Sequence, residues 1–300
     1  MKQSPNQSLV NAWIFLDEDE PPNTNYNNSN SAYQTLIQNN IYQSIDILCL
    51  SFVSTVPTAY NTVPIGDGSS YTIQIESANH LNGLTNQDYM NNIIRDARKN
   101  NPNIKIVVTL DWSNVYILSN IFSNPDYTPL QNALYFAVNL VKYLDYYQLD
   151  GFDIDWELPI SDSITQIQFA LIINTIGTLF KINPNKQYYL ILSAAEIGNL
   201  DADAVNNNID FINLQLYGGA SPQDFINAGV NSDLFAYGAK FEADISVNDP
   251  NAMGYQTANN AYEDNNNNYH YPIFTNWRIN SQNYLFEQIQ QQLLYKLVFP

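Results

Sequence analysis

The sequence predicts a single α/β domain of the (β/α)8, or TIM-barrel, class, spanning residues 1–300. Apolar or β-branched runs alternate with stretches of helical periodicity, and eight such pairs fit within the 300 residues. No linker rich in Pro, Gly and Ser divides the chain. An open, doubly wound sheet shows the same alternation, so it remains the alternative architecture.

Eight strands are expected where short runs are rich in apolar, β-branched and aromatic residues. Runs of this kind, without strict polar alternation, are typical of parallel strands that are covered on both faces. In chain order the ranges are Leu9–Leu16, Ile47–Val53, Ile104–Leu110, Gly151–Glu157, Tyr188–Ala195, Phe211–Tyr217, Ala236–Phe241 and Tyr271–Trp277.

Helices are expected between the strands. Asp162 or Ser163 is predicted to cap the fourth helix, since both residue types accept from free N–H groups at a helix start. In the last helix, Leu285, Ile289 and Leu293 repeat every four residues, which predicts a stripe against the core. The ranges are Ser31–Asn40, Asn86–Lys99, Pro129–Tyr147, Asp162–Ile182, Ala202–Asn206, Pro222–Ala228, Asn251–Tyr262 and Ser281–Leu297.

The composition excludes several classes of partner. Only 11 Lys and Arg stand against 29 Asp and Glu, for a net charge of −18. Binding nucleic acid through its phosphates, or an anionic membrane surface, needs clustered cations. No apolar run is long enough to cross a membrane, so membrane insertion is not expected. Neutral ligands fit better, and the 22 Tyr, 14 Phe and 4 Trp supply rings that can stack on sugars.

Cysteine and histidine are too scarce for a disulfide framework or a zinc site. Cys49 is alone in an apolar run, and His80 and His270 have no ligand spacing. We therefore expect no metal and no cofactor. The start of the chain lacks a long apolar segment of the secretory type. We expect export by a non-classical route, as part of a larger secreted or toxin assembly, with a cytoplasmic location as the alternative.

The segment Leu149–Glu157 carries the clearest chemical signal. Its acids Asp153, Asp155 and Glu157 alternate with apolar residues. Residues two apart on a strand share a face, so the three carboxyls form a column. Burying three unpaired carboxylates inside a barrel would destabilise the folded state by on the order of several kcal/mol, unless the carboxyls share protons. Stability alone does not explain this. A solvated acidic strand or a Ca²⁺ site is the alternative.

These residues also carry a family resemblance. The octet Asp150–Glu157, read as DGFDIDWE, resembles the DGxDxDWE signature of glycoside hydrolase family 18 and lies on the fourth predicted strand. That family includes chitinases, endo-β-N-acetylglucosaminidases and inactive lectin-like members. The resemblance implies retaining hydrolysis in which the substrate's own acetamido group attacks, an exception to the usual scheme of two carboxylates.

The resemblance assigns a role to each acid. Glu157 is the expected general acid, and Asp155 is expected to orient the acetamido group and stabilise the oxazolinium intermediate. Asp153 is expected to share a proton with Asp155, and Asp150 to brace that pair from below. A general acid must hold its proton near neutral pH, and neighbouring negative charge favours this.

Two other predicted strand ends fit the same family. Gln215 and Tyr217 are predicted to lie on one face of the sixth strand. By resemblance, Tyr217 donates to the acetamido oxygen, and Gln215 lines the same subsite. Trp277, at the end of the eighth strand, matches the family's tryptophan floor under the sugar at the cleavage point.

The chain also departs from the family pattern. The third strand ends in Asp111 and Trp112 where the family has small residues. Asp111 adds a carboxylate to the site or bonds loop backbone, and Trp112 is an aromatic platform or a cover on the barrel. Glu196 is expected to bond substrate or to pair with Arg278. The connection before the last strand is only about thirty residues, which leaves no room for the α+β insertion domain of many chitinases.

The leading hypothesis is an endo-acting, chitinase-like glycoside hydrolase that cleaves β-1,4-linked N-acetylglucosamine polymers and so serves chitin degradation and carbohydrate metabolism. Cleavage of the chitobiose core of N-glycans is the first alternative, based on the altered third strand and the missing insertion. A non-catalytic, carbohydrate-binding lectin on the same barrel is the second. The sequence does not decide between endo and exo action.

Overall fold

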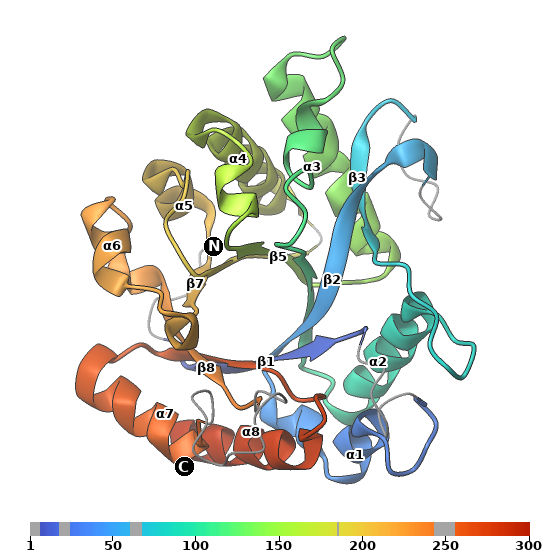
Figure 1. The fold of residues 1–300 in the computed structure, drawn as a ribbon, viewed down its shortest axis with the longest axis vertical. Coiled ribbons are helices and arrows are strands. Elements are labelled where there is room, and N and C mark those ends of the chain that lie inside the picture. The colour runs from blue at the N-terminus through green and yellow to red at the C-terminus, as the bar shows by residue number, and fades with distance from the viewer. Residues whose placement is uncertain (1–6, 18–24, 61–67, 185, 243–255) are drawn as a thin grey trace. The chain divides into compact units, whose positions relative to one another are not determined.

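The computed structural model describes residues 7–17, 25–60, 68–184, 186–242 and 256–300 (Figure 1). The strands follow the order β1-β9-β8-β7-β6-β5-β4-β2-β3, and β1 also pairs with β2, so the sheet closes. Eight of these strands form the parallel barrel, and helices alternate with them along the chain. The (β/α)8 class is therefore confirmed.

The strands fall close to the predicted ranges. Their bounds are β1 Leu9–Phe15, β2 Ile47–Pro57, β3 Tyr71–Ile75, β4 Lys105–Leu110, β5 Gly151–Trp156, β6 Tyr189–Ala194, β7 Phe211–Leu214, β8 Phe235–Lys240 and β9 Ile273–Trp277. The sequence missed β3, which pairs antiparallel with the end of β2 as a hairpin outside the repeating pattern. It also placed the end of the sixth predicted strand three residues too late, because β7 stops at Leu214 and the chain turns into a 3₁₀ helix.

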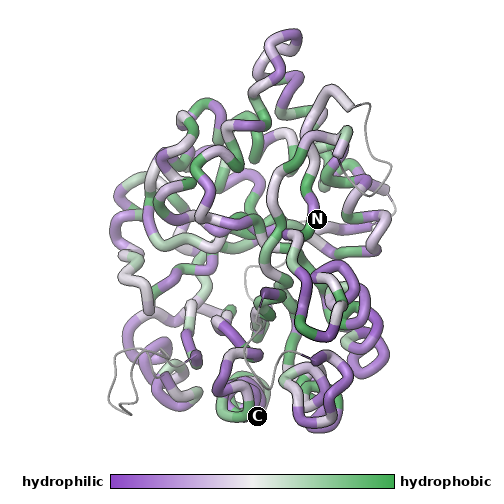
Figure 2. The backbone as a smooth tube through the Cα atoms, turned by 45° about the vertical axis from the view of Figure 1, so that its right-hand side comes forward, coloured by the Kyte–Doolittle hydropathy of each residue, from purple (hydrophilic) through white to green (hydrophobic). Residues whose placement is uncertain are grey.

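The helices are also close to the predicted ranges. Their bounds are α1 Ala32–Gln38, α2 Asn86–Asn100, α3 Pro129–Tyr146, α4 Gln166–Ile182, α5 Ala202–Asn208, α6 Pro222–Asn227, α7 Ala258–Asp264 and α8 Tyr284–Val298. The first residues of the predicted range Asn251–Tyr262 lie outside the described residues. Figure 2 shows hydrophobic and hydrophilic residues interspersed along the helices, as expected where one helix face is buried and the other is solvated. None of the described helices combines the length and the apolar character that a membrane crossing requires.

The chain divides into two compact units. Among the described residues, unit 1 is built from Phe52–Ile75 and Val107–Phe235, and unit 2 from Asn6–Ser51, Glu76–Ile106 and Ala236–Pro300. Unit 1 contains β5, β6 and β7 with helices α3 to α6, whereas unit 2 contains β1 and β9 with α1, α2, α7 and α8. The chain passes between the units within β2, directly after β3, within β4 and at the start of β8.

Unit 1 holds the acidic strand in a tight setting. β5 pairs in parallel with β4 on one side and β6 on the other. A Cβ added at Gly151 would lie 2.4 Å from the Tyr189 carbonyl oxygen, so this position accepts only glycine without backbone movement. On the outside, α4 packs between α3 and α5 (Figure 1). These contacts fix the register of the strand that carries the acids.

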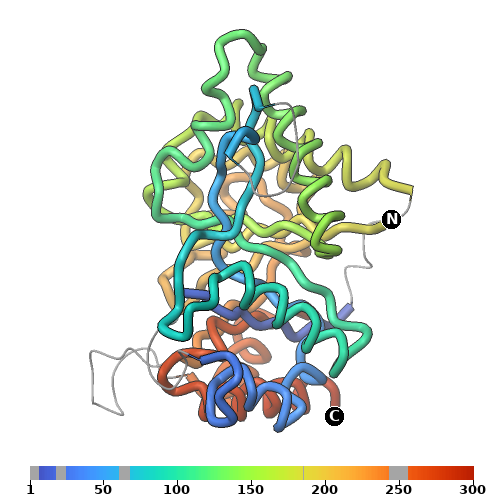
Figure 3. Tube along the Cα trace, turned by 90° about the vertical axis from the view of Figure 1, so that its right-hand side faces the viewer, coloured from blue at the N-terminus to red at the C-terminus, as the bar shows by residue number. Residues whose placement is uncertain are grey.

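The β2–β3 hairpin lies against the loop that follows β4, and its two strands are visible in shades of blue beside the green loop in Figure 3. The Asn124 side chain donates to the Ser69 carbonyl at 2.7 Å, and Asn139 donates to the Tyr71 carbonyl at 3.0 Å. Thr55 donates to the Ile117 carbonyl at 2.5 Å. Side-chain bonds to backbone carbonyls thus fasten the hairpin to this loop and to α3.

The start of α4 differs from the prediction. Its cap is Thr165, whose hydroxyl accepts from the Gln168 N–H while the Gln168 side chain accepts from the Thr165 N–H. Asp162 instead ends a separate short 3₁₀ helix. The reciprocal Thr–Gln pair satisfies two free N–H groups, and the sequence prediction overlooked it.

The predicted buried face of α8 is wrong, although its residue range was close. Leu285, Ile289 and Leu293 are 54%, 55% and 40% exposed, whereas Glu287, Gln288 and Gln291 are buried. The Gln288 amide donates to the Ala32 and Ile279 carbonyls, and the Gln291 amide donates to the Ser44 carbonyl. Buried amides with carbonyl partners lose little on desolvation, so this face packs inward.

Candidate active site

The acidic column of β5 is present, and its alternation follows the pleat. Asp153 and Asp155 are buried on the inner face of the strand, and Glu157 follows the strand half-buried. The apolar residues between them face the helices instead. Trp156 contacts Phe169 of α4 edge-on, with ring centroids 4.7 Å apart, and its indole N–H donates to the Ile197 carbonyl. The strand therefore separates carboxyls from aromatic packing.

Asp153 lies at the bottom of the column and is fully buried. Its carboxyl accepts from the Ser193 hydroxyl at 3.0 Å and from the Thr109 hydroxyl at 3.0 Å. Burial raises the pKa of Asp153 to about 7, and the two hydroxyl bonds oppose that rise. Near neutral pH this carboxyl therefore holds a proton part of the time.

Asp155 and Glu157 are the last two acids of the column. Burial, followed by the negative charge of Glu157, raises the pKa of Asp155 well above its ordinary value. The charges of Asp153 and Asp111 and a hydrogen bond with Glu157 act in the same direction. Asp155 therefore retains a proton at pH values where a lone Asp has lost it.

The side-chain amide of Gln215, the residue that follows β7, donates to both acids. Its Nε2 donates to Asp155 Oδ1 at 2.8 Å and to Glu157 Oε1 at 2.9 Å. The two acceptor oxygens therefore lie within about 6 Å of each other, the reach of two hydrogen bonds. The sequence predicted Gln215 in this subsite, but not that one amide would join both acids.

Tyr217 lies in the 3₁₀ helix Leu216–Gly218 rather than on a strand, and it is half-buried. The predicted strand alternation of Gln215 and Tyr217 is therefore wrong, because the backbone of Gln215 leaves the extended conformation with ψ of 68°. Tyr217 thus follows Gln215, whose amide contacts both acids, by two residues in a turn rather than along a strand.

The sequence left open whether Asp111 adds a carboxylate to the site or bonds loop backbone, and its contacts agree with both. Its carboxyl accepts from the Ser113 N–H at 3.1 Å and from the Ser113 hydroxyl at 2.6 Å, so it orders the loop after β4. Its charge also contributes to the raised pKa of Asp155. Trp112, the next residue, is half-buried at the start of this loop.

Two acids of the prediction lie elsewhere in unit 1. Glu196 accepts a short hydrogen bond from the buried Ser161 hydroxyl, which ties the loop after β6 to the loop after β5. Asp150 precedes the amino end of β5 and forms an ion pair with Lys186 at 3.4 Å. Six strand residues separate Asp150 from Glu157, about 20 Å of extended chain, so Asp150 lies too far from Glu157 to contact a sugar held there.

In unit 2, Trp277 ends β9 and is half-buried. Its indole N–H donates to Glu242 Oε2 at 2.7 Å. Arg278, which the sequence offered as a partner for Glu196, forms its ion pair with Glu242 at 2.8 Å. The peptide bond between Trp277 and Arg278 is cis.

Thr109, Ser193 and Glu242 were missed by the sequence prediction. Thr109 and Ser193 stand beside Asp153 and Asp155 in the register of the sheet, so both side chains point to the inner face. A polar residue on an otherwise apolar buried strand was the available signal. Among the described residues, no three acidic, histidine or cysteine side chains gather as metal ligands.

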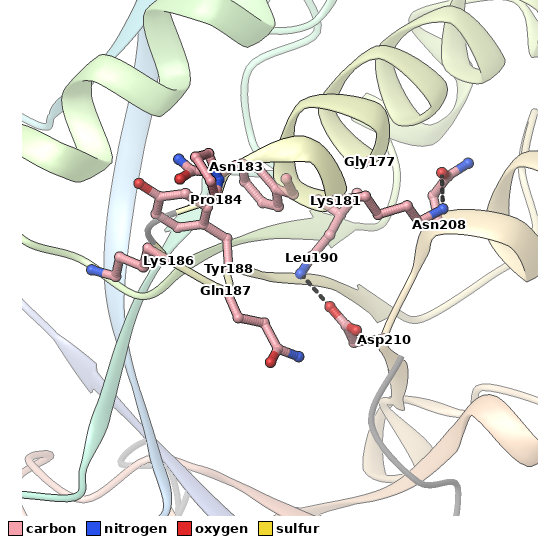
Figure 4. A pocket seen from close by; sticks show the side chains of 11 residues that line it. Gly177, Lys181, Asn183, Pro184, Lys186, Gln187, Tyr188, Leu190, Asn208 and Asp210 are labelled. Carbon is pink, nitrogen blue, oxygen red and sulfur yellow. Dashed lines mark hydrogen bonds between the residues drawn. The ribbon is translucent and has the colours of Figure 1, made fainter. Parts of the chain in front are cut away.

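A pocket of about 320 Å³ in unit 1 is distinct from the column (Figure 4). It lies between the end of α4 and the start of β6, at the end of the strands away from Glu157. Its lysines are already engaged: Lys181 donates to Asn208, and Lys186 to the Leu149 carbonyl. This pocket therefore offers no unbound cation to a ligand.

The sequence profile described as glycosyl hydrolases family 18 matches residues 22–287, and the chain belongs to that family. Among solved structures, the class V chitinase from Nicotiana tobaccum is 14% identical, with a TM-score of 0.65 over 96% of this chain and 99% of that one. Human YKL-39, described as a pseudo-chitinase with retained chitooligosaccharide binding, is 12% identical, with a TM-score of 0.64 over 97% and 98%. The chitinase-like agglutinin from Robinia pseudoacacia is 12% identical, with a TM-score of 0.65 over 95% and 99%. At these identities the likeness shows the fold alone.

Proposed function

We propose that the protein hydrolyses β-1,4-linked N-acetylglucosamine chains with retention of configuration, using the substrate's acetamido oxygen as the nucleophile. The observation that carries the proposal is that one Gln215 amide donates to both Asp155 and Glu157 at the end of the acidic column. A family member that only binds sugars has no need for a buried carboxyl with a raised pKa, such as that of Asp155, beside a second acid.

In the first step, Glu157 donates its proton to the glycosidic oxygen as the C1–O bond breaks. The acetamido oxygen attacks C1 at the same time and forms the cyclic oxazolinium ion. Asp155 accepts from the acetamido N–H and stabilises the positive charge that develops there. Its buried position strengthens this interaction, because little water competes for the carboxylate.

In the second step, the Glu157 carboxylate removes a proton from water, and the resulting oxygen bonds to C1 and reopens the ring. Asp153 supports both steps as a neighbouring acid whose pKa is about 7, so it can take a proton when Asp155 turns toward the substrate. Tyr217 is proposed to donate to the acetamido oxygen, and Trp277 to stack under the sugar.

The test compares Glu157→Gln with the matched change Glu196→Gln on N-acetylglucosamine oligomers. Glu196 is also a glutamate that follows a strand, but it bonds Ser161 rather than the column. We expect Glu157→Gln to lower kcat by about 10²- to 10⁴-fold, the usual contribution of a general acid. Glu196→Gln is expected to retain kcat within about twofold, because no catalytic contact is lost.

Equal activity of Glu157→Gln and the unchanged protein would overturn the proposal. Binding of the oligomers without any turnover by the unchanged protein would support a lectin instead. Turnover of a glycoprotein but not of the oligomers, seen as a mobility change on a gel, would move the substrate to the chitobiose core of N-glycans.

A further inference from the structure

The indole of Trp277 is anchored by a carboxylate from the neighbouring strand of unit 2. β8 and β9 pair in parallel with Lys240 beside Trp277, and Glu242 follows two residues later. The N–H groups of Phe241 and Glu242 donate to the Trp277 carbonyl at 3.0 and 3.4 Å. Glu242 Oε2 accepts from the indole N–H at 2.7 Å. Both the backbone and the ring of Trp277 are thus tied to one short segment.

The other oxygen of Glu242 binds a buried cation. Arg278 donates to Glu242 Oε1 through Nε at 3.1 Å and through a terminal nitrogen at 2.8 Å. Arg278 is only 6% exposed, so its charge needs this partner. Lys240 adds a longer ion pair with Glu242 at 3.8 Å. Glu242 is therefore oriented by two cations before it accepts from the indole.

The guanidinium of Arg278 also lies over aromatic rings. Its central carbon is 5.1 Å from the centroid of Phe15 and 5.7 Å from that of Trp277. The two rings are 6.3 Å apart and tilted by 43°. Phe15 is fixed in turn, since its N–H and carbonyl both bond the Asn280 side chain. The indole therefore has a defined partner at its N–H and a cation beside its ring.

We propose that Glu242 is a positioning residue that holds the Trp277 indole in the orientation needed to stack on an N-acetylglucosamine ring. The proposal rests on the proposed function, in which Trp277 lies under the sugar. A tryptophan side chain rotates about two bonds, and a hydrogen bond from its N–H to a carboxylate restricts both. Without this bond, part of the binding energy would be spent on ordering the ring.

The test measures binding of an N-acetylglucosamine tetramer by calorimetry, with Glu157→Gln as the background so that no substrate is consumed. Glu242→Ala is expected to weaken binding about tenfold, because the indole loses its acceptor. Glu242→Gln keeps a carbonyl oxygen that can accept from the indole, so it is expected to stay within about threefold of the unchanged residue. Glu263→Gln, an exposed acid on α7, is the matched control.

The decisive comparison repeats Glu242→Ala in a Trp277→Phe background. Phenylalanine can still stack on a sugar but has no N–H, so Glu242→Ala should then change binding by less than about twofold. Glu242→Ala also leaves Arg278 without its carboxylate partner. The effect of that loss on binding is the same in both backgrounds, so it cancels when the two changes in affinity are compared. Melting curves confirm that each variant is folded at the assay temperature.

An equal loss in both backgrounds, or no loss in either, would overturn the positioning role while the hydrolytic function stands. Failure of the unchanged protein to bind or cleave the oligomers would instead reject the proposed function and this role with it. The indole ¹H–¹⁵N spectrum supplies an independent check. We expect the Trp277 N–H to exchange with solvent faster in Glu242→Ala than in Glu242→Gln.

Discussion

Asp155 and Glu157 accept hydrogen bonds from the same side-chain amide, since Gln215 Nε2 lies 2.8 Å from Asp155 Oδ1 and 2.9 Å from Glu157 Oε1. One amide thereby fixes the two acids relative to each other. Neither residue alone explains the raised pKa of Asp155, because burial and the charge of Glu157 are its two largest causes. The proposed hydrolysis depends on this pair.

Removing the amide that joins the acids is expected to impair catalysis more than binding. Gln215→Ala leaves both carboxyls without their common donor, so their orientation is less defined in the transition state. We expect kcat to fall about 10- to 100-fold with little change in KM, in line with the loss of one preorganised hydrogen bond. Steady-state kinetics on N-acetylglucosamine oligomers measure both constants.

Gln223→Ala is the matched control for that variant. Gln223 lies on α6, is exposed, and donates to Asn227. Its loss should leave kcat unchanged. A Gln215→Ala protein with the full kcat would show that the amide has no part in positioning the acids.

Replacing Asp153 by asparagine is expected to change the pH dependence of stability. The folded pKa of Asp153 is about 7 against 3.8 without burial. A raised pKa means that the folded state binds the proton more tightly, so this stabilisation is complete below pH 3.8 and is lost as pH rises through 7. Asp153→Asn should therefore gain stability relative to the unchanged protein between pH 4 and 8, by up to about 4 kcal/mol.

Urea unfolding at pH 4 and pH 8 measures that gain, and the exposed Asp126, changed to Asn, serves as the reference. A difference in unfolding free energy that is the same at both pH values would contradict the raised pKa of Asp153.

The cap of α4 gives a prediction about stability alone. Thr165→Ala removes the hydroxyl that accepts from the Gln168 N–H and should lower the free energy of unfolding by about 1 kcal/mol. Asp162→Ala, at the cap that the sequence suggested, should cost less than about 0.5 kcal/mol because the residue is exposed and lies outside the helix. Chemical denaturation distinguishes the two, and the reverse order of losses would place the cap at Asp162.

The sequence predicted the acidic column because all of its members lie in one segment with a strand period. The hydrogen-bond partners of Asp153 could not be predicted in this way. Thr109 and Ser193 come from two other strands, and only the register of the sheet brings their hydroxyls to the same carboxyl. The sequence also placed Asp150 with the column. In the structure Asp150 precedes β5, at the end of the strand away from Glu157, and pairs with Lys186.

The barrel class followed from the repeated alternation of strands and helices, but the buried faces did not all follow from hydrophobicity. In α8, the buried face is marked by glutamines whose amides reach backbone carbonyls of α1 and of the segments around it. Periodicity of leucine and isoleucine carries no information about such partners, so Leu285 and Ile289 were assigned to the wrong face. The β2–β3 hairpin was missed because it interrupts the repeat.

The most direct measurement is the configuration of the sugar released first from an N-acetylglucosamine oligomer, followed by ¹H NMR before the anomers equilibrate. Attack by the acetamido oxygen and then by water inverts C1 twice, so the β anomer should appear first. First appearance of the α anomer would contradict a mechanism built on Asp155 and Glu157.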